Sequence, residues 1–269
     1  MKLTRAFKTI RKRISAPLHI EFNLTDHCNL NCKGCSHYSP LAPAEFEALD
    51  EVEAEMKHIS SIRNVSLIKE VYLIGGETLL YPRLKDAMRL ARRYFPSVKI
   101  SIFTNGLLLP KMDEEFWHLC SELKIVIAIT RYPVKFDYDA VEQLCKEKGV
   151  ETEVFGDRGE DDSFFKLPLD PMKKQNGWIS HFKCFSFGCI TIDHGKVFPC
   201  SQAACVGHLN RKCGTDFRWE PGDYIPVEEL TDARQLLKLR NRPIPFCKYC
   251  RKPEVTAYGP SRRTASEWT

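Results

Sequence analysis

Three cysteines stand close together near the start of the chain. Cys28, Cys32 and Cys35 (the first cysteine set) lie in the stretch TDHCNLNCKGCSHYSP. Thiolates are strong ligands for zinc and for iron–sulfur clusters. A closed structural zinc site has four protein ligands, so three neighbouring thiols leave one position for another ligand. The spacing therefore predicts a cluster or metal site with an open position, or a zinc site that takes a distant fourth ligand.

The last third of the chain is rich in cysteine, with seven of the twelve cysteines between Cys184 and Cys250. Cys247 and Cys250 form a C-x2-C pair, a common metal-binding spacing. Since no secretory signal is recognisable, metal ligation is favoured over a disulfide framework. Cys120 and Cys145 stand at helical spacing from apolar residues and are interpreted as buried core thiols.

Polar motifs follow three other apolar segments. GGE at 75–77 follows EVYLI, TNG at 104–106 follows ISIF, and Arg131 follows KIVIAIT. Each motif alone is typical of a turn, because Gly and Asn tolerate positive φ. Together with a cysteine set at the same edge of a sheet, they indicate a binding site.

An alternation of strands and helices is expected to position these motifs. Apolar residues recur at intervals of three and four between Phe46 and Ile62, which predicts an amphipathic helix. Five β/α repeats with short loops indicate a parallel sheet, either doubly wound or curled into a full or partial barrel. In both forms ligands bind at the carboxyl ends of the strands. The expected strands are 19–25, 70–75, 98–106, 124–130 and 151–156, and the expected helices are 46–62, 82–94, 113–123 and 139–148.

The C-terminal third has a different pattern. Short apolar segments flank His194-Gly195, which predicts a β-hairpin. The symmetry of that hairpin sets Cys189 across from Cys200. A helix-like stretch over residues 227–242 then leads to the C-x2-C pair.

Residues 157–178 join the fifth strand to this hairpin and are rich in charge, proline and aromatic residues. A stretch of this length without secondary structure is either functional or disordered in a compact domain. We expect a lid that meets the substrate and excludes water, with Arg158 contacting the substrate and Phe164 and Phe165 closing over it. The alternative is a solvated linker.

Composition limits the classes of protein that fit. The chain has 269 residues, 43% of them hydrophobic, and a net charge of +5, which suits one large domain or one domain with a small appendage. The basic run from Met1 to Arg13 is interpreted as a solvated face, so we expect no nucleic-acid partner. No apolar run approaches the length of a membrane span, and a cytoplasmic location is expected.

The first cysteine set, GGE and TNG, each following one of the first three strands, resemble the radical S-adenosylmethionine (SAM) superfamily. The resemblance implies that the three thiolates hold a [4Fe–4S] cluster whose fourth iron binds SAM, which would supply the missing ligand. One departure is Gly34, where the family often has an aromatic residue. Arg131 replaces a polar run of many relatives and is either a contact to a carboxylate or phosphate or a surface residue. The implied SAM contacts are Gly75, Gly76 and Glu77 at the amino group, and Thr104 and Asn105 near the ribose and carboxylate.

The spacing of the later cysteines resembles a twitch domain, the shortened relative of the SPASM domain. By that resemblance Cys184, Cys200, Cys247 and Cys250 (the second cysteine set) hold an auxiliary [4Fe–4S] cluster. Cys189 is the alternative to Cys184 as the first ligand, and a zinc hairpin-and-knuckle is the alternative to the cluster. Cys205 and Cys213 are left without an assigned role.

The resemblance implies an α/β fold, a partial (β/α)6 TIM-like barrel with a small β-hairpin and helix domain for the auxiliary cluster. The expected divisions are a basic segment over 1–16, the barrel over 17–180, the twitch-type domain over 181–250 and a tail over 251–269.

The expected reaction is reductive cleavage of SAM to a 5′-deoxyadenosyl radical that abstracts hydrogen from the substrate. A second closed cluster favours oxidation, as in 2-deoxy-scyllo-inosamine dehydrogenase, which resembles this chain in architecture, as do the anaerobic sulfatase-maturating enzymes. About sixteen residues before the first strand are too few for a leader-binding domain, so we expect a small polar metabolite such as a sugar or aminocyclitol. A flavodoxin- or ferredoxin-like protein is the expected electron donor.

Three alternatives stay open at this point. An epimerase would use a thiol such as Cys205 or Cys213 to return a hydrogen atom. A peptide- or protein-modifying enzyme would use the same radical on a side chain. A non-catalytic iron–sulfur or zinc module would bind a partner through the basic N-terminus.

Overall fold

The computed structural model describes residues 16–156 and 163–269. The basic run at the N-terminus and Arg158, the expected substrate contact, lie outside the described residues. Within them, no helix is long and apolar enough to cross a membrane.

Five parallel strands in chain order form one side of the main sheet, whose full order is β5-β4-β3-β2-β1-β7-β8-β9. Each strand pairs with the strand before it, as in a barrel wall, so the doubly wound alternative is wrong. All five expected strands are present. They are β1 (Leu18–Asn23), β2 (Ile68–Ile74), β3 (Lys99–Thr104), β4 (Ile125–Thr130) and β5 (Thr152–Phe155).

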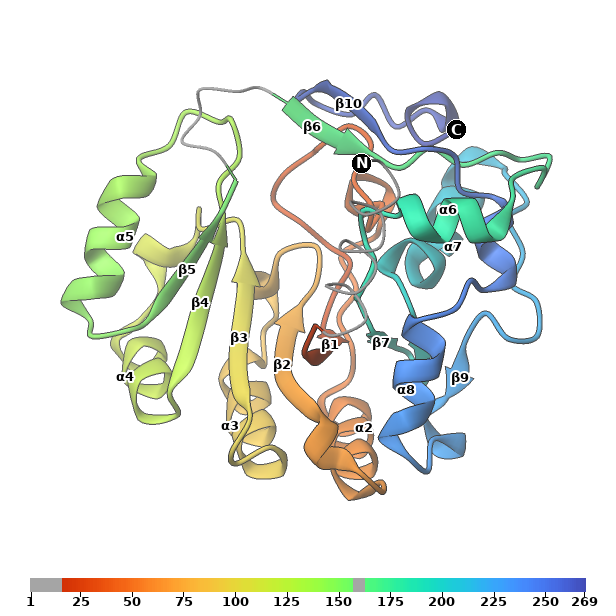
Figure 1. Ribbon diagram of the computed structural model, residues 1–269. Coiled ribbons are helices and arrows are strands. Elements are labelled where there is room, and N and C mark those ends of the chain that lie inside the picture. The colour runs from red at the N-terminus through yellow and green to blue at the C-terminus, as the bar shows by residue number, and fades with distance from the viewer. Residues whose placement is uncertain (1–15, 157–162) are drawn as a thin grey trace, which may run out of the picture.

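Four helices follow the first four strands and cover one face of the sheet (Figure 1). Two of them begin at aspartate N-caps, since the Asp113 and Asp137 side chains accept hydrogen bonds from the backbone N–H groups of Phe116 and Ala140. Asp113 is the expected first residue of its helix, whereas Asp137 lies two residues before the expected start of its own. The helices are α2 (Leu49–Ser61), α3 (Leu84–Tyr94), α4 (Glu114–Glu122) and α5 (Tyr138–Glu147).

The main hydrophobic core lies between these helices and the sheet. Ile20 and Ile127 on the strands and Met56, Met88 and Phe116 on the helices are fully buried. Burial of each such side chain contributes about 1.5–3 kcal/mol. The expected core thiols Cys120 and Cys145 belong to this cluster.

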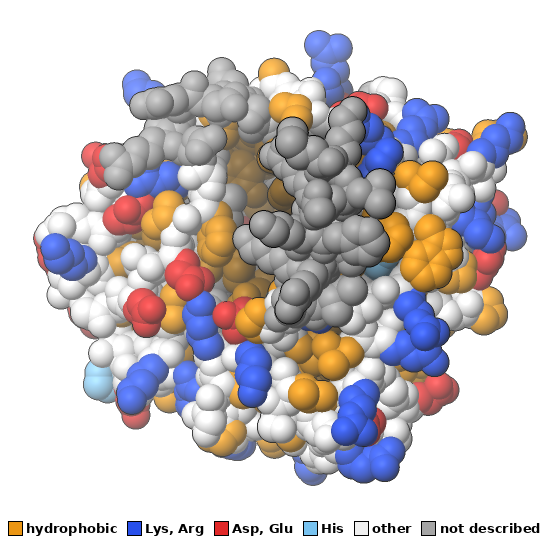
Figure 2. All heavy atoms as spheres, viewed as in Figure 1, with side chains coloured by type: hydrophobic (Ala, Val, Ile, Leu, Met, Phe, Trp, Pro, Cys, Tyr) orange, Lys and Arg blue, Asp and Glu red, His pale blue; other side chains and the backbone are white. Residues whose placement is uncertain are grey.

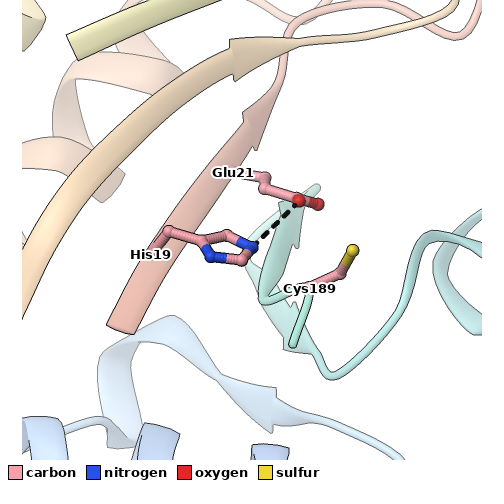
Figure 3. A group of neighbouring side chains, drawn as sticks. All are labelled: His19, Glu21 and Cys189. Carbon is pink, nitrogen blue, oxygen red and sulfur yellow. Dashed lines mark ion pairs between the residues drawn. The ribbon is translucent and has the colours of Figure 1, made fainter. Parts of the chain in front are cut away.

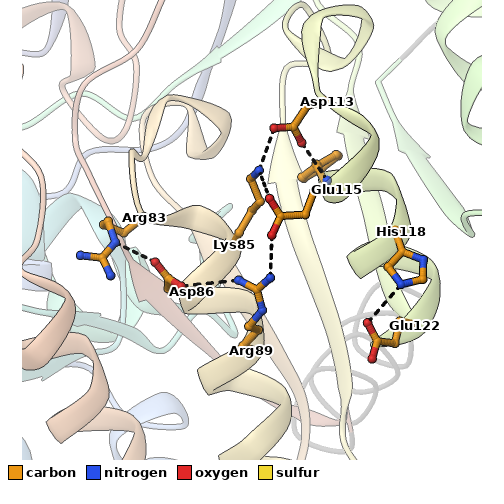
Figure 4. A network of polar contacts seen from close by, with 9 residues as sticks. Arg83, Lys85, Asp86, Arg89, Asp113, Glu115, His118 and Glu122 are labelled. Carbon is orange, nitrogen blue, oxygen red and sulfur yellow. Dashed lines mark hydrogen bonds and ion pairs between the residues drawn. The ribbon is translucent and has the colours of Figure 1, made fainter.

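Surface charges link α3 to α4 (Figure 4). Lys85 contacts Asp113 and Glu115, and Arg89 contacts Glu115, at 2.5–2.7 Å. All four side chains are partly or largely exposed, so solvent screening leaves these pairs little effect on stability. The network joins two neighbouring helices.

The hairpin of the C-terminal third continues the barrel sheet. Its first strand, β7 (Thr191–Asp193), pairs with β1 in parallel, and its second, β8 (Lys196–Phe198), pairs with β7 in antiparallel. β9 (Ile225–Pro226) completes this edge. The (β/α)6 expectation is therefore corrected: the described chain has five strands in order, and the sixth parallel strand is β7 on the opposite side of β1.

Residues 157–178 were expected to lack secondary structure, and this is wrong for the described part. β6 (Ser163–Lys166) pairs with β10 (Glu254–Ala257), and α6 (Gly177–Lys183) follows. β6 and β10 cross above the carboxyl ends of the strands in Figure 1. These two strands were not predicted, because both are only four residues long and pair only with each other.

Two further helices complete the C-terminal third. α8 (Ala233–Arg240) lies inside the expected helical stretch and begins with a capping box at Asp232. α7 (Ser201–Cys213) was missed, although Gly214 ends it in the left-handed conformation typical of a helix C-terminus. Short 3-10 turns are η1 (Ser39–Leu41), η2 (Val65–Leu67), η3 (Thr78–Leu80), η4 (Leu109–Lys111), η5 (Val227–Glu229), η6 (Pro245–Lys248) and η7 (Ala265–Glu267).

Candidate functional site

A pocket of about 280 Å³ lies at the carboxyl ends of the strands. It brings together residues that are far apart in the sequence, and Figure 2 shows hydrophobic side chains around a hollow on this face of the molecule. The predicted residues that line it are the first cysteine set with Gly75, Gly76, Thr104 and Asn105. Glu21, His37, Tyr72, Tyr132 and Cys189 line the same pocket and were not predicted to do so.

The thiols of the first cysteine set have polar neighbours. The backbone N–H of Leu30 donates to Cys28 Sγ at 3.3 Å, and the Cys32 thiol lies 3.5 Å from the Tyr258 hydroxyl. Burial raises the pKa of Cys28 and of Cys32 to about 12. Burial also opposes ionisation of Cys35, but the hydrogen bond and charge of His37 outweigh it and lower the pKa of Cys35. Binding of a metal or cluster would therefore release protons from Cys28 and Cys32.

Residues of the expected tail hold the first cysteine loop in place. The Lys33 N–H donates to the carbonyl of Gly259 at 2.9 Å, and the Ser261 N–H donates to the carbonyl of Asn31 at 2.7 Å. The Trp268 indole N–H donates to the carbonyl of Cys35 at 2.8 Å, and its side chain is 1% exposed. The segment over 251–269 thus packs on the first cysteine loop, which no motif in the segment predicted.

Gly75 and Gly76 are required by the backbone of the loop that leads to Cys28. A Cβ on Gly75 would lie 2.3 Å from the carbonyl oxygen of Thr25, and a Cβ on Gly76 would lie 2.4 Å from that of Asp26. The Gly76 N–H donates to the Thr25 carbonyl at 2.7 Å. The two glycines were expected to let backbone approach a ligand. In the structure they let the end of β2 approach the backbone of residues 25 and 26, which anchors the first cysteine loop on β2.

Glu77 is 1% exposed, and both of its oxygens are occupied by this chain. Oε1 accepts from the Thr104 hydroxyl at 2.6 Å and from the Leu79 N–H at 3.0 Å, while Oε2 accepts from the Asn105 N–H at 2.8 Å. Burial raises the pKa of Glu77, although these hydrogen bonds act in the opposite direction. The geometry favours a carboxylate that ties the end of β2 to the end of β3, rather than direct pairing with an ammonium group.

Asn105 links this tie to the first cysteine loop. Its amide donates to Asn29 Oδ1 at 2.7 Å and lies 3.9 Å from Cys28 Sγ. Thr104 and Asn105 both line the pocket, with the Thr104 hydroxyl already bound to Glu77. Asn105 therefore joins the end of β3 to the segment that carries Cys28.

Arg131 points to α5 and is not among the pocket-lining residues. Its guanidinium contacts Asp139 at 2.8 Å and Glu142 more closely, and its side chain is 8% exposed. Arg131 is thus a buried partner of α5, not an exposed surface residue, and its expected contact with SAM or substrate stays a prediction. The neighbouring residue that does line the pocket is Tyr132.

The two phenylalanines of the expected lid lie on β6. The Phe164 ring is 6.3 Å from Tyr132 and 5.8 Å from Tyr258, beside the first cysteine loop. The Phe165 ring stacks on Phe185 at 4.7 Å, and Phe185 lines the pocket. Both therefore lie near the pocket, as part of the β6–β10 ribbon.

The second cysteine set comes from three segments that meet around η6. Cys184 follows α6, Cys200 precedes α7, and Cys247 and Cys250 lie in and just after η6. The Ser180 hydroxyl donates to the Cys250 carbonyl at 2.6 Å, which joins α6 to η6. Burial, together with the charge of the other thiols, raises the pKa of Cys200 and of Cys250 well above its usual value. Four mutually close thiols of this kind can hold a cluster with full protein ligation.

Neither cysteine set has the spacing of a single zinc ion. A tetrahedral zinc with Zn–S bonds of about 2.3 Å holds its thiolates about 3.8 Å apart. In the described chain, the groups of three ligand atoms that lie within 4.8 Å of one another are His19/Glu21/Cys189 and Glu47/Glu51/His194. Neither cysteine set is among these groups, so no three of its sulfur atoms all lie within 4.8 Å of one another.

Three other cysteines have separate surroundings. The hairpin register pairs Thr191 with Phe198, so its extension sets Cys189 across from Cys200, yet Cys189 also lines the pocket beside Glu21. Cys205 donates to Asp26 Oδ1 at 3.4 Å, and Cys213 lies 3.7 Å from the carbonyl of Arg263. Neither Cys205 nor Cys213 is among the residues that line the pocket.

Comparisons with known proteins agree with this geometry. Residues 22–137 match the family described as the Radical SAM superfamily. GTP 3′,8-cyclase of Chlorobaculum tepidum is 30% identical over 93 residues, 35% of this chain and 27% of the relative. The antilisterial bacteriocin subtilosin biosynthesis protein AlbA of Bacillus subtilis is 30% identical over 115 residues, 42% of this chain and 24% of the relative.

A solved structure extends the likeness of the fold. The crystal structure of BtrN in complex with AdoMet and 2-DOIA covers 88% of this chain and 93% of its own, with 17% identity and a TM-score of 0.55. The chain thus matches about a quarter of the length of the curated relatives but most of one solved fold. Residues 22–137, which match the Radical SAM superfamily, hold the first cysteine set, GGE and TNG.

Proposed function

We propose that this chain is a radical SAM oxidoreductase that dehydrogenates a small polar metabolite, a sugar or aminocyclitol. The observation that carries the proposal is one pocket that holds the first cysteine set, the GGE glycines and Thr104-Asn105. A cluster bound there would supply the electron that cleaves SAM to methionine and a 5′-deoxyadenosyl radical, which abstracts hydrogen from substrate carbon.

The protein groups around the first cysteine set suit such a cluster. Cys28, Cys32 and Cys35 would be its ligands, and the Leu30 N–H would donate to the Cys28 sulfur, as groups that tune cluster potentials do. Gly75 and Gly76 expose backbone next to these thiols, and Thr104 and Asn105 face the same pocket. Tyr132, Phe164 and Tyr258 form an aromatic group beside the loop that would keep water from the reacting atoms.

The second cysteine set supports oxidation over a redox-neutral reaction. Its four partly buried cysteines would hold a cluster with no open position, which suits a centre that accepts an electron rather than one that binds SAM. The thiols considered for an epimerase, Cys205 and Cys213, stand outside the pocket lining. A flavodoxin- or ferredoxin-like protein would supply the electron for SAM cleavage.

Anaerobic reconstitution tests this proposal. We expect about eight irons per chain, and 5′-deoxyadenosine on addition of SAM and dithionite. A panel of polyols and aminocyclitols should yield one product that has lost two hydrogen atoms. Bound zinc without SAM cleavage would overturn the enzyme assignment. A product of unchanged mass that gains deuterium from heavy water would replace dehydrogenation by epimerisation, and turnover of peptides alone would replace the substrate class.

A further inference from the structure

A cluster of three potential metal ligands lies in the wall of the pocket, apart from both cysteine sets. His19, Glu21 and Cys189 offer a nitrogen, a carboxylate oxygen and a sulfur atom, and these atoms all lie within 4.8 Å of one another (Figure 3). Glu21 and Cys189 line the pocket. The cluster therefore faces the space in which the substrate would bind.

Sheet register brings the three side chains together. His19 and Glu21 are two residues apart on β1 and so point to the same face of the sheet. β7 pairs with β1 in parallel, with Thr191 opposite Glu21, and the Glu21 N–H donates to the Ile190 carbonyl at 2.8 Å. Cys189 precedes this pairing and is held beside Glu21. The arrangement is thus fixed by backbone hydrogen bonds of the main sheet.

The separation of His19 and Glu21 suits a shared metal ion. His19 Nε2 lies 3.4 Å from Glu21 Oε1, which is longer than a direct N–H···O hydrogen bond of about 2.7–3.2 Å. A tetrahedral zinc with bonds of about 2.0–2.1 Å to nitrogen and oxygen separates these two ligands by about 3.3 Å. The observed distance leaves room for an ion between the two groups.

Neighbouring groups fix the orientation of both ligands. The Thr191 hydroxyl donates to Glu21 Oε2 at 3.0 Å, which leaves Oε1 turned toward His19. The His19 ring stacks on Tyr72, with ring centroids 4.8 Å apart and 26° between the ring planes. Outer contacts of this kind are typical of metal-binding carboxylates and imidazoles.

The positive neighbours of Glu21 are histidines. Its side chain is 9% exposed, and the charges that act on it favourably are those of His19 and His37. A buried carboxylate is costly when its counter-charge is lost. The imidazole of His19 carries charge only when protonated, whereas a divalent cation would compensate Glu21 at all pH values at which it binds.

The other compact group in the described chain is a weaker candidate. His194 Nδ1 lies 2.7 Å from Glu47 Oε2, a direct hydrogen-bonding distance, and the His194 side chain is 66% exposed. That geometry is an ordinary ion pair, with Glu51 nearby on the surface of α2. The His194 group is therefore the control for the His19, Glu21 and Cys189 group.

We propose that His19, Glu21 and Cys189 bind one Zn²⁺ ion whose fourth position is open to the pocket. Zinc accepts mixed nitrogen, oxygen and sulfur ligands, and three protein ligands with one open position are typical of zinc sites that bind water or substrate. The open position takes a water molecule or a hydroxyl or amine of the metabolite. Binding of the metabolite at this position rests on the proposed function. Zinc binding itself does not, since it is independent of SAM cleavage.

The test uses the full chain with its iron–sulfur content reconstituted, followed by one equivalent of zinc and removal of unbound metal. Zinc and iron are measured by mass spectrometry, and zinc K-edge absorption reports the ligand types. We expect about one zinc per chain with a single sulfur ligand. His19→Ala, Glu21→Gln and Cys189→Ser should each weaken zinc binding at least tenfold while iron content stays at the wild-type level, which also shows that the variants fold.

Matched controls are available on the surface. His118 lies 3.6 Å from Glu122 on α4, a histidine–glutamate pair without a cysteine (Figure 4). His118→Ala and His194→Ala should both leave zinc binding unchanged. The proposal is overturned if wild type holds no zinc, if His194→Ala removes it, or if the zinc spectrum shows several sulfur ligands. Loss of iron in Cys189→Ser would instead assign that thiol to the auxiliary cluster and overturn the zinc site, while leaving the proposed function standing.

Discussion

The first cysteine set comes from one loop of eight residues, whereas the second is assembled from three segments that span residues 184–250. The first loop is held by distant groups, namely GGE at the end of β2 and the residues around Gly259 and Trp268. The second set sits at the ends of α6, α7 and η6, beside a second hydrophobic core that also takes in Tyr38 and Trp268. The contiguous motif is thus held by hydrogen bonds from remote residues, while the dispersed motif is brought together by the ends of three elements.

The largest effect is expected from Cys32→Ala, which tests whether the two sets are independent. Because the sets share no residue, this variant should lose about half of the iron and all SAM cleavage. Iron analysis and chromatography of 5′-deoxyadenosine measure both. Loss of all iron would mean that the second set depends on the first.

Cys250→Ser is the matching change in the second set. We expect loss of about half of the iron, with SAM cleavage retained and product formation lost. Electron paramagnetic resonance of the reduced protein should show one cluster signal instead of two. Retained product formation would remove the second set from the proposed reaction.

Trp268→Ala tests the support of the first loop by a remote residue. Removal of this buried ring should cost about 3–5 kcal/mol of unfolding free energy, measured by denaturant titration. Because the indole also holds the carbonyl of Cys35, we expect the first cluster to be lost faster than the second on exposure to chelator. Equal rates of loss would contradict a specific link to the first loop.

Glu77→Gln should have a smaller effect, since size is kept and one carboxylate with three hydrogen bonds is replaced. We expect a cost of about 1–3 kcal/mol in stability and a moderate rise in the Kd for SAM, with iron content unchanged. Glu115→Gln, at an exposed ion pair of α4, is the control and should change neither. An unchanged unfolding free energy in Glu77→Gln would contradict the tie between β2 and β3.

Tyr258→Phe is expected to give the smallest change. It removes only the hydroxyl 3.5 Å from Cys32, so stability should change by about 1 kcal/mol or less. The reduction potential of the first cluster should shift, because hydrogen bonds near the sulfurs tune it. A titration that leaves the potential of the first cluster unchanged would show that the hydroxyl does not act on it.

Much of the barrel could be predicted because its strands and helices repeat a simple pattern. The apolar strands and the aspartate N-caps of α4 and α5 are local signals. The place of β7 beside β1 was not predictable, since three residues carry no information about a partner more than 160 positions earlier. The same applies to Trp268 and Tyr258, whose roles depend on contacts across the whole chain.

Residue type alone did not always distinguish residues that would bind a cofactor from residues that hold the site together. The cysteine spacings led directly to both sets, because thiols have few other uses at such density. Arg131 and Glu77 were assigned to a ligand because their charges suit one, but the nearest partners of each lie within this chain. A charged residue after a strand can face the pocket or the outer helices, and sequence does not give that direction.

The contact between Cys32 and Tyr258 joins positions that are 226 residues apart. On a ribosome that adds about 5–20 residues per second, the loop with the first cysteine set emerges about 10–45 s before the residues that enclose it. During that interval its thiols are open to scaffold proteins, oxidants and stray metal ions. Delivery of iron and sulfide is therefore expected to precede closure, and late segments of the chain would seal the cofactor in place.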